Sequence, residues 1–442
     1  MTPRWSASVA LRGLRDDRLF RNSLFLALNS GAIAAFGFAF WLLNTRLFTA
    51  GQVGKATVLI SGASLLSSIS LLGFNTTFVR FLPTSRHRDA DINTGLLIVF
   101  IAALIAASLY AFLVPSLAPG LAFIRGSFGA AAGFIVFTAF WAVNMVTDSV
   151  FIAFRKAQYN LLVDGVIQGV VKLALPVFLV GLGAYGIFVS SGAAAGAAVA
   201  ASIVFMTRAC GYKPRLWLSY GAVRRSFHYS AANYAANLLN LGPILVTPLI
   251  ILSVRGPRDA AFYFVAFQVA SLLYAVGYAV SISFFAEGSY EDSDLPSLLR
   301  RSARVLALIC LPASIIVAVA GHWILLLFGH AYSANATSAL VILALSAPSL
   351  ALCSTATAVL RITKQLRALL AVNAVYALVI VTLTLLGARH GLYWVALAWL
   401  IGNTTAGLLA TLLAAVHARR HDDRSDPHPA PEPHGHGRVS LD

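Results

Sequence analysis

The sequence predicts an all-α integral membrane protein, with twelve transmembrane helices in two six-helix lobes related by a pseudo-two-fold axis along the membrane normal. Of its 442 residues, 59% are hydrophobic and only 11% are charged, whereas soluble domains carry about 25% charged residues. The apolar runs approach the ~20 residues that a helix needs to cross a bilayer, and they lack the ~10-residue alternation of membrane β-strands. The second half of the chain also repeats features of the first.

Taken in order, the chain begins with an arginine-rich cytoplasmic segment, residues 1–21. The apolar run that follows is longer than the ~7–15-residue core of a signal peptide, so we expect a retained first helix. Pro312 and Gly321 interrupt the ninth span. Residues 419–442 are polar and rich in Pro and His, which is typical of a disordered tail. The twelve spans are predicted at residues 22–43, 54–75, 93–114, 129–153, 161–181, 185–206, 229–252, 260–284, 303–327, 338–360, 367–387 and 391–416.

Lys and Arg are distributed unevenly between the predicted loops. With the N-terminus in the cytoplasm, 25 of the 32 lie on the cytoplasmic side, 6 lie on the outer side, and Lys172 lies within a helix. This bias predicts a multi-pass protein with both termini in the cytoplasm. It also accounts for most of the net charge of +16 without a nucleic-acid partner.

The internal repeat has a unit of six helices. "AFRKAQYNLL" follows the fourth span and "VLRITKQLRALL" follows the tenth, which aligns Arg155 with Arg361, 206 residues later. Six is an even number, so both halves enter the membrane from the same side, as in transporters that hold substrate between two lobes. We therefore predict lobes over residues 22–206 and 229–418, joined by a cytoplasmic linker over residues 207–228.

The segment "LNTRLFTAGQVGKATVLISGASLLSSISLLGFNTTFVRFLPTS" resembles the opening helix pair of the polysaccharide flippases in the multidrug/oligosaccharidyl-lipid/polysaccharide (MOP) exporter superfamily. The resemblance rests on the aromatic-rich first helix, the short loop from Phe48 to Gly54, and Gly73 and Arg80 closing the second helix. "FRKAQ" and the Gly-rich sixth span agree with it, and it covers roughly residues 20–418.

This resemblance implies a V-shaped, two-lobed flippase in the bacterial inner membrane. Its cargo would be an undecaprenyl-pyrophosphate-linked oligosaccharide, moved from the inner to the outer leaflet by alternating access for lipopolysaccharide or exopolysaccharide biosynthesis. We expect a monomer without a cofactor, working beside a polysaccharide polymerase and glycosyltransferases.

Lys172 is the ionisable residue predicted to lie deepest in the membrane. It follows Leu161 by eleven residues, or ~16 Å of helix, which is close to the midplane. Asp164, Gln168 and Lys172 are spaced by four and should form one polar stripe facing a water-filled cavity. Lys172 then either binds the lipid pyrophosphate or an acidic sugar, with Gln168 beside it, or forms a structural ion pair with Asp164 or Asp148.

Asp148 and Asp164 lie near the cytoplasmic ends of their helices. They are candidates for a gate that pairs across the lobes with Arg361 or Arg367, whereas the helix dipole alone also explains Asp164. Proton coupling through either aspartate remains a second possibility. Arg80 is a candidate contact for the pyrophosphate at the cytoplasmic mouth, or a positive-inside anchor.

Several amides lie within the spans, where they either join helices or bind sugar hydroxyls. Asn29, Asn144 and Asn237 are the candidates for substrate binding. A sodium site in the second lobe is a speculative alternative, and no cysteine or histidine spacing predicts another metal site. Its oxygen ligands would come from Asn237, Asn373, Asn403 and Thr404.

Two other functions compete with the flippase. A drug/cation antiporter of the same superfamily should carry a deep carboxylate for coupling, and the sequence has none clearly at the midplane. A membrane glycosyltransferase or polymerase needs a sizeable outer loop with catalytic groups, but the outer loops are short and contain no paired carboxylates. The sequence therefore predicts a transporter and not an enzyme.

Overall fold

The structure is a computed structural model that describes residues 18–214, 220–288 and 295–425. All regular structure in these residues is helical, and twelve segments are long and apolar enough to cross a membrane. The predicted all-α class and the number of spans are thus confirmed for the described residues. The ninth span is one continuous helix despite Pro312.

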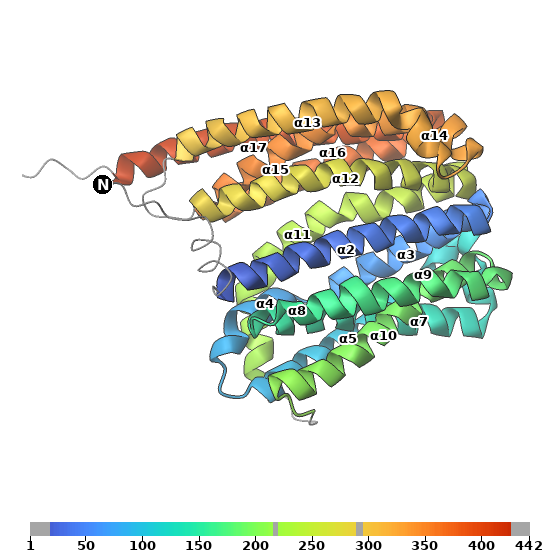
Figure 1. The fold of residues 1–442 in the computed structure, drawn as a ribbon, viewed down its shortest axis with the longest axis horizontal. Coiled ribbons are helices and arrows are strands. Elements are labelled where there is room, and N and C mark those ends of the chain that lie inside the picture. Colours follow the sequence, from blue (N-terminus) through green and yellow to red (C-terminus); the bar gives the residue numbers. More distant parts are fainter. Residues whose placement is uncertain (1–17, 215–219, 289–294, 426–442) are drawn as a thin grey trace, which may run out of the picture.

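The first six spans form the lower part of the molecule in Figure 1 and the last six form the upper part. The first lobe contains α2 (Arg18–Leu47), α3 (Ala50–Ser70), α4 (Phe74–Phe81), η1 (Leu82–Thr84), α5 (Arg88–Leu117), η2 (Pro119–Leu121), α6 (Phe123–Gly126), α7 (Phe128–Ala153), α8 (Ala157–Asn160), the π-helical η3 (Leu161–Gln168), α9 (Gly169–Phe178), η4 (Val180–Leu182) and α10 (Ala184–Cys210). The second lobe contains α11 (Tyr220–Arg255), α12 (Pro257–Gly288), α13 (Leu295–Leu326), α14 (His330–Leu345), α15 (Ala347–Ile362), α16 (Leu366–Gly387), η5 (Ala388–His390) and α17 (Leu392–Ser425).

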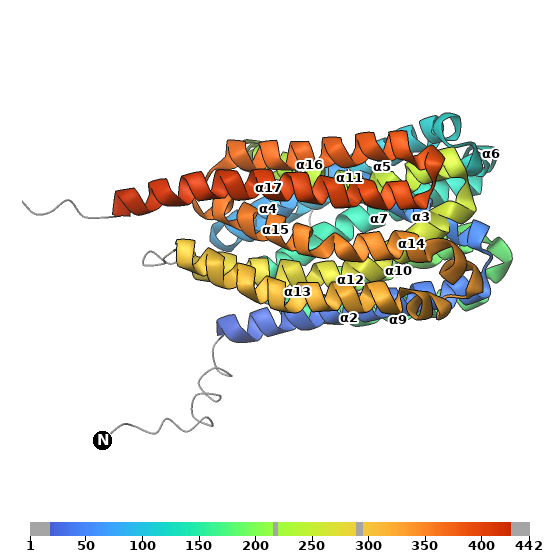
Figure 2. The same ribbon diagram turned by 90° about the horizontal axis from the view of Figure 1, so that it is seen from above.

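The spans run along one common axis in both ribbon views (Figures 1 and 2). We call the end that holds the start of α2 and the end of α17 the basic end, and the opposite end the far end. Three helices extend past the predicted domain boundaries. Helix α17 continues to Ser425, so the predicted tail begins as helix, and α10 and α11 occupy most of the predicted linker over residues 207–228.

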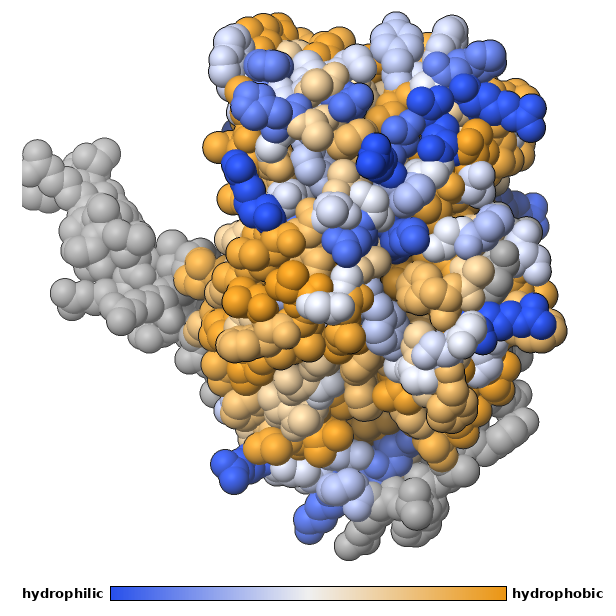
Figure 3. Space-filling model, turned by 90° about the vertical axis from the view of Figure 1, so that its right-hand side faces the viewer, coloured by the Kyte–Doolittle hydropathy of each residue, from blue (hydrophilic) through white to orange (hydrophobic). Residues whose placement is uncertain are grey.

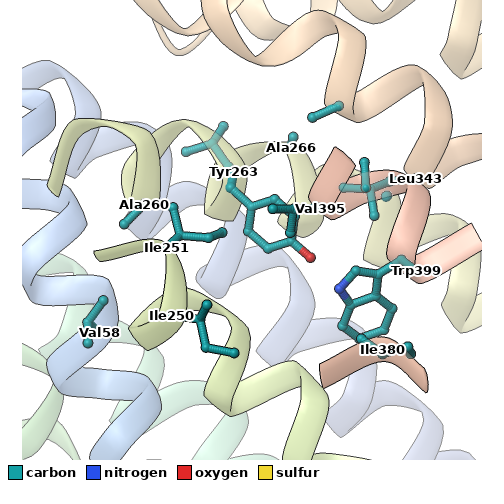
Figure 4. Packing of buried hydrophobic residues seen from close by; sticks show 14 of the residues in the cluster. Val58, Ile250, Ile251, Ala260, Tyr263, Ala266, Leu343, Ile380, Val395 and Trp399 are labelled. Carbon is teal, nitrogen blue, oxygen red and sulfur yellow. The ribbon is translucent and has the colours of Figure 1, made fainter. Parts of the chain in front are cut away.

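The largest hydrophobic cluster spans both lobes. It joins Val58 of α3 to Ile250 of α11, Tyr263 of α12 and Trp399 of α17 (Figure 4), and most of its first-lobe members lie in the far halves of their helices. The buried members of a second cluster, which includes Phe74 of α4, come from the first lobe alone. The lobes therefore share one core toward the far end and keep separate cores toward the basic end.

The two halves repeat one turn in atomic detail. Lys156 N donates to Phe151 O and Gln365 N donates to Leu360 O, and both residues of the second pair lie 209 residues after their equivalents in the first. Arg155 and Lys364, with φ of 55° and 57°, occupy the same left-handed position. The repeat is real, but the register is three residues longer than predicted, because Arg155 corresponds to Lys364 and not to Arg361.

Candidate functional site

The lobes meet at the far end in a close backbone contact. A Cβ atom on Gly54 would overlap the carbonyl oxygen of Pro257 and lie 3.1 Å from the amide nitrogen of Ala261. Only glycine therefore lets α3 and α12 approach this closely. The Arg46 side chain crosses the same boundary, donating from Nε to Leu327 O at 3.1 Å at the end of α13.

Aromatic side chains complete this contact. The rings of Phe38 and Phe328 meet edge to face with centroids 5.3 Å apart, and those of Trp41 and Phe264 do so at 4.5 Å. Trp41 is only 4% exposed. We call the contacts of Gly54, Arg46 and these four rings the far-end seal. Figure 3 looks onto the far end, where hydrophilic and hydrophobic side chains are interspersed.

A polar pocket lies between the lobes on the side of the basic end. Its volume is about 240 Å³, and its lining comes from α4 of the first lobe and from α11 and α15 of the second. Beside it, the Tyr234 hydroxyl donates to Ile69 O and lies 3.2 Å from Ser68 O, both in the first lobe. We call this cavity the inter-lobe pocket. Its lining residues are Asn75, Thr76, Tyr234, Ala236, Asn237, Asn240 and Arg361.

The inter-lobe pocket contains the predicted substrate contact Asn237 and the predicted gate residue Arg361. Arg361 is the only charged residue in its lining, which carries no carboxylate. Arg80 follows Thr76 by one helical turn on α4, toward the basic end. Asn75 and Asn240 also line the pocket, although the sequence analysis had not singled them out as binding residues. Asn75 and Asn240 come together only because helices that are distant in sequence pack against each other. No local sequence pattern therefore identifies them as pocket residues.

A second polar group lies inside the first lobe. Asn144 Nδ2 on α7 donates to Asp164 Oδ1 on η3 at 2.9 Å, and the carboxyl group of Asp148 lies against that of Asp164. Asn29 Oδ1 on α2 lies beside Gly165, where a Cβ would approach it to 3.1 Å. The structure thus brings together Asn29, Asn144, Asp148 and Asp164, which the sequence placed in three separate spans.

Asn160 lies beside these four residues, since its Nδ2 donates to Asp148 O at 3.4 Å, and we call all five the carboxyl group cluster. Within the described residues, four of its oxygen atoms are buried and accept no hydrogen bond. They are Oδ1 of Asn29, Asn144, Asp148 and Asn160. Among the described residues, neither aspartate forms an ion pair with Arg361 or Arg367 in this state. The predicted cross-lobe gate is therefore not formed in this conformation.

Lys172 differs most from its predicted surroundings. Its Nζ lies 4.6 Å from the ring centroid of Phe40 on α2, a cation–π contact, and no described carboxylate lies within ion-pair distance. The predicted ion pair with Asp164 or Asp148 is absent. Lys172 lies fifteen residues after the start of its span and six before Phe178, in the half of the span toward the far end.

The single polar stripe predicted for Asp164, Gln168 and Lys172 is wrong for a local reason. Residues Leu161–Gln168 form a π-helix, whose wider turn breaks the spacing of 3.6 residues. Asp164 consequently faces Asn144 of α7, whereas Lys172 faces Phe40 of α2. Such π-helical insertions are frequent at functional sites.

The four residues predicted to form a sodium site make other contacts. Asn373 Nδ2 donates to Ala236 O at 3.2 Å, Asn403 Nδ2 donates to Trp399 O at 2.8 Å, and Thr404 Oγ1 donates to Leu400 O at 2.7 Å. None of these bonds joins one of the four predicted ligands to another. Asn237 lines the inter-lobe pocket instead.

Comparison with known structures defines the class of protein. The chain has the fold of MOP superfamily transporters. It is similar to the lipid II flippase MurJ in an inward-closed conformation (TM-score 0.72, 12% identity, covering 91% of this chain and 90% of that one). It is also similar to a multidrug resistance MATE family transporter in inward-facing (0.68, 14%, 91% and 99%) and outward-facing (0.62, 13%, 93% and 98%) conformations.

The particular family follows from the sequence. The family described as "Polysaccharide biosynthesis protein" matches residues 45–337, and the chain belongs to this family. None of the curated proteins matches the chain significantly. The predicted recognition as a polysaccharide biosynthesis transporter with the MOP fold is confirmed.

Proposed function

We propose that the protein flips a lipid-linked oligosaccharide, with undecaprenyl pyrophosphate as its carrier, from the inner to the outer leaflet of the bacterial inner membrane. The basic end would face the cytoplasm, an orientation that the distribution of Lys and Arg supports. The far-end seal then closes the outer side, while the separate cores at the basic end leave the lobes free to admit cargo. Opening of the seal would release the oligosaccharide outside, which is alternating access.

The observation that carries this proposal is the chemistry of the inter-lobe pocket. Three amides, two hydroxyls and one guanidinium line it, without a carboxylate. Amides and hydroxyls suit sugar hydroxyl groups, and the guanidinium suits an anion. Organic cations would be repelled by the same lining. This favours the flippase over a drug/cation antiporter, although both share the fold.

The carboxyl group cluster supports coupling to protons. Two carboxyl groups in contact can share one proton. Asp148 and Asp164 lie within the first lobe and away from the pocket that would take the cargo. We therefore assign proton coupling to this pair, and cargo binding to the inter-lobe pocket with Arg80 at its mouth. Lys172 would contact the charged head nearer the far end.

Deletion of the gene tests the proposal. Cells without the protein should lose surface polysaccharide and accumulate its lipid-linked precursor on the cytoplasmic leaflet, and the intact gene should restore both. Normal surface polysaccharide in the deletion strain, together with drug sensitivity that the gene reverses, would contradict the flippase function and support a drug/cation antiporter.

A further inference from the structure

We propose that the inter-lobe pocket binds an acidic monosaccharide of the cargo, with Arg361 holding its carboxylate and the pocket amides holding its hydroxyl groups. This inference rests on the proposed function and specifies the class of glycan. It would make the protein selective for oligosaccharides that carry a carboxylated sugar, such as a uronic acid.

The size of the pocket selects a single sugar ring. Its volume of about 240 Å³ falls below the ~300–1,000 Å³ of pockets that enclose drug-sized ligands. A whole oligosaccharide would extend beyond it into the space between the lobes. One ring, inserted between α4 on one side and α11 and α15 on the other, would touch both lobes at once.

The charge of the pocket selects an anion with one negative charge. Arg361 supplies the only formal charge in the lining, and a planar guanidinium matches one carboxylate through two parallel hydrogen bonds. A diphosphate carries more charge and would require further cations. Arg80, one turn from Thr76 toward the basic end, lies where the diphosphate of the carrier lipid would follow the sugar.

The hydrogen-bonding groups of the pocket are available to a ligand. In the described part of the chain, no protein group accepts a hydrogen bond from Arg361, and none bonds the side-chain amides of Asn237 or Asn240. Thr76 Oγ1 donates to Gly73 O at 3.1 Å and lies 3.5 Å from Asn75 Oδ1, so these two side chains are engaged with their own helix. The guanidinium, which carries five N–H donors, and two amides therefore line the cavity without a competing partner among the described residues.

Purified full-length protein provides the test, with thermal stability measured against added glucuronic acid, glucose and inorganic pyrophosphate. We expect glucuronic acid to raise the melting temperature more than glucose does. Arg361→Gln should weaken glucuronic acid binding about tenfold, because it removes a charge-assisted pair of hydrogen bonds. Arg361→Lys should recover part of the loss. Lys364→Gln is the matched control, since it removes a charge from the next turn outside the lining, and should bind normally.

Two results would overturn the inference. Equal stabilisation by glucose and glucuronic acid, or unchanged glucuronic acid binding in Arg361→Gln, would show that the pocket does not select a carboxylate. Pyrophosphate could instead displace glucuronic acid, with binding that Arg361→Gln weakens more strongly. That result would show that the guanidinium binds the diphosphate of the carrier lipid. Either result leaves the flippase intact if precursor still accumulates in the deletion strain. Conversely, selective glucuronic acid binding without a polysaccharide phenotype would refute the flippase function but support the carboxylate selectivity of the pocket.

Discussion

Replacing Gly54 by alanine should open the far-end seal. The new methyl group would overlap the carbonyl oxygen of Pro257, a backbone atom that cannot move aside as a flexible side chain would. Overpacking of this kind costs ~1–3 kcal/mol. The cost applies only while the seal is closed, so the population with an open far end should rise about 5- to 150-fold, at ~1.4 kcal/mol for each factor of ten.

Gly51 offers a matched control on the same helix. A Cβ atom there meets nothing within 4 Å. Alanine gains ~1 kcal/mol of helix propensity over glycine at either position, so this contribution cancels between the two variants. Any difference between Gly54→Ala and Gly51→Ala then reports the contact with Pro257.

Cysteine labelling measures the opening. Val58 is fully buried in the cluster shared by both lobes, so Val58→Cys should react with a maleimide only when the far end opens. The background needs Cys210, Cys310 and Cys353 replaced by alanine. We expect the labelling rate to rise in Gly54→Ala and to stay at the background rate in Gly51→Ala. Equal rates in the two variants would refute the seal.

Three further predictions concern side chains. Arg46→Ala removes a charged donor from the end of α13. Because Arg46 is exposed, we expect the closed seal to lose only about 1 kcal/mol of stability, and Val58→Cys to be labelled roughly fivefold faster. An unchanged labelling rate would exclude Arg46 from the seal. Asp164→Asn should make polysaccharide export insensitive to collapse of the proton gradient, and sensitivity equal to that of the wild type would contradict proton coupling through this cluster. Lys172→Gln should reduce export without lowering the amount of folded protein, whereas normal export would limit Lys172 to its packing on Phe40.

The course of the chain through the membrane was predictable because it depends on local composition. Apolar length alone locates the spans. The sequence also contains a start signal for α3 that the apolar pattern obscures. Thr49 and Gln52 form a capping box, with Gln52 N donating to Thr49 Oγ1 at 3.3 Å, so the helix begins at Ala50 and not at the predicted residue 54.

The site was harder to predict because it depends on helix rotation and on contacts between distant segments. A π-helix at Leu161–Gln168 turns Asp164 away from Lys172, and periodicity based on 3.6 residues cannot anticipate it. Arg361 was predicted as a gate residue that pairs with Asp148 or Asp164, whereas in the structure it lines the inter-lobe pocket with Asn75 and Asn240. Those neighbours come from helices far apart in sequence, so only the folded chain defines them.

Flipping by the purified protein tests whether the protein itself moves a lipid-linked oligosaccharide between leaflets. Proteoliposomes would contain an undecaprenyl-pyrophosphate-linked oligosaccharide, and a membrane-impermeant glycosidase would measure how much of it reaches the opposite leaflet. We expect transfer that requires the protein and is reduced in Gly54→Ala but not in Gly51→Ala. Transfer equal to that of protein-free liposomes, from protein that is folded and correctly inserted, would contradict the flippase function.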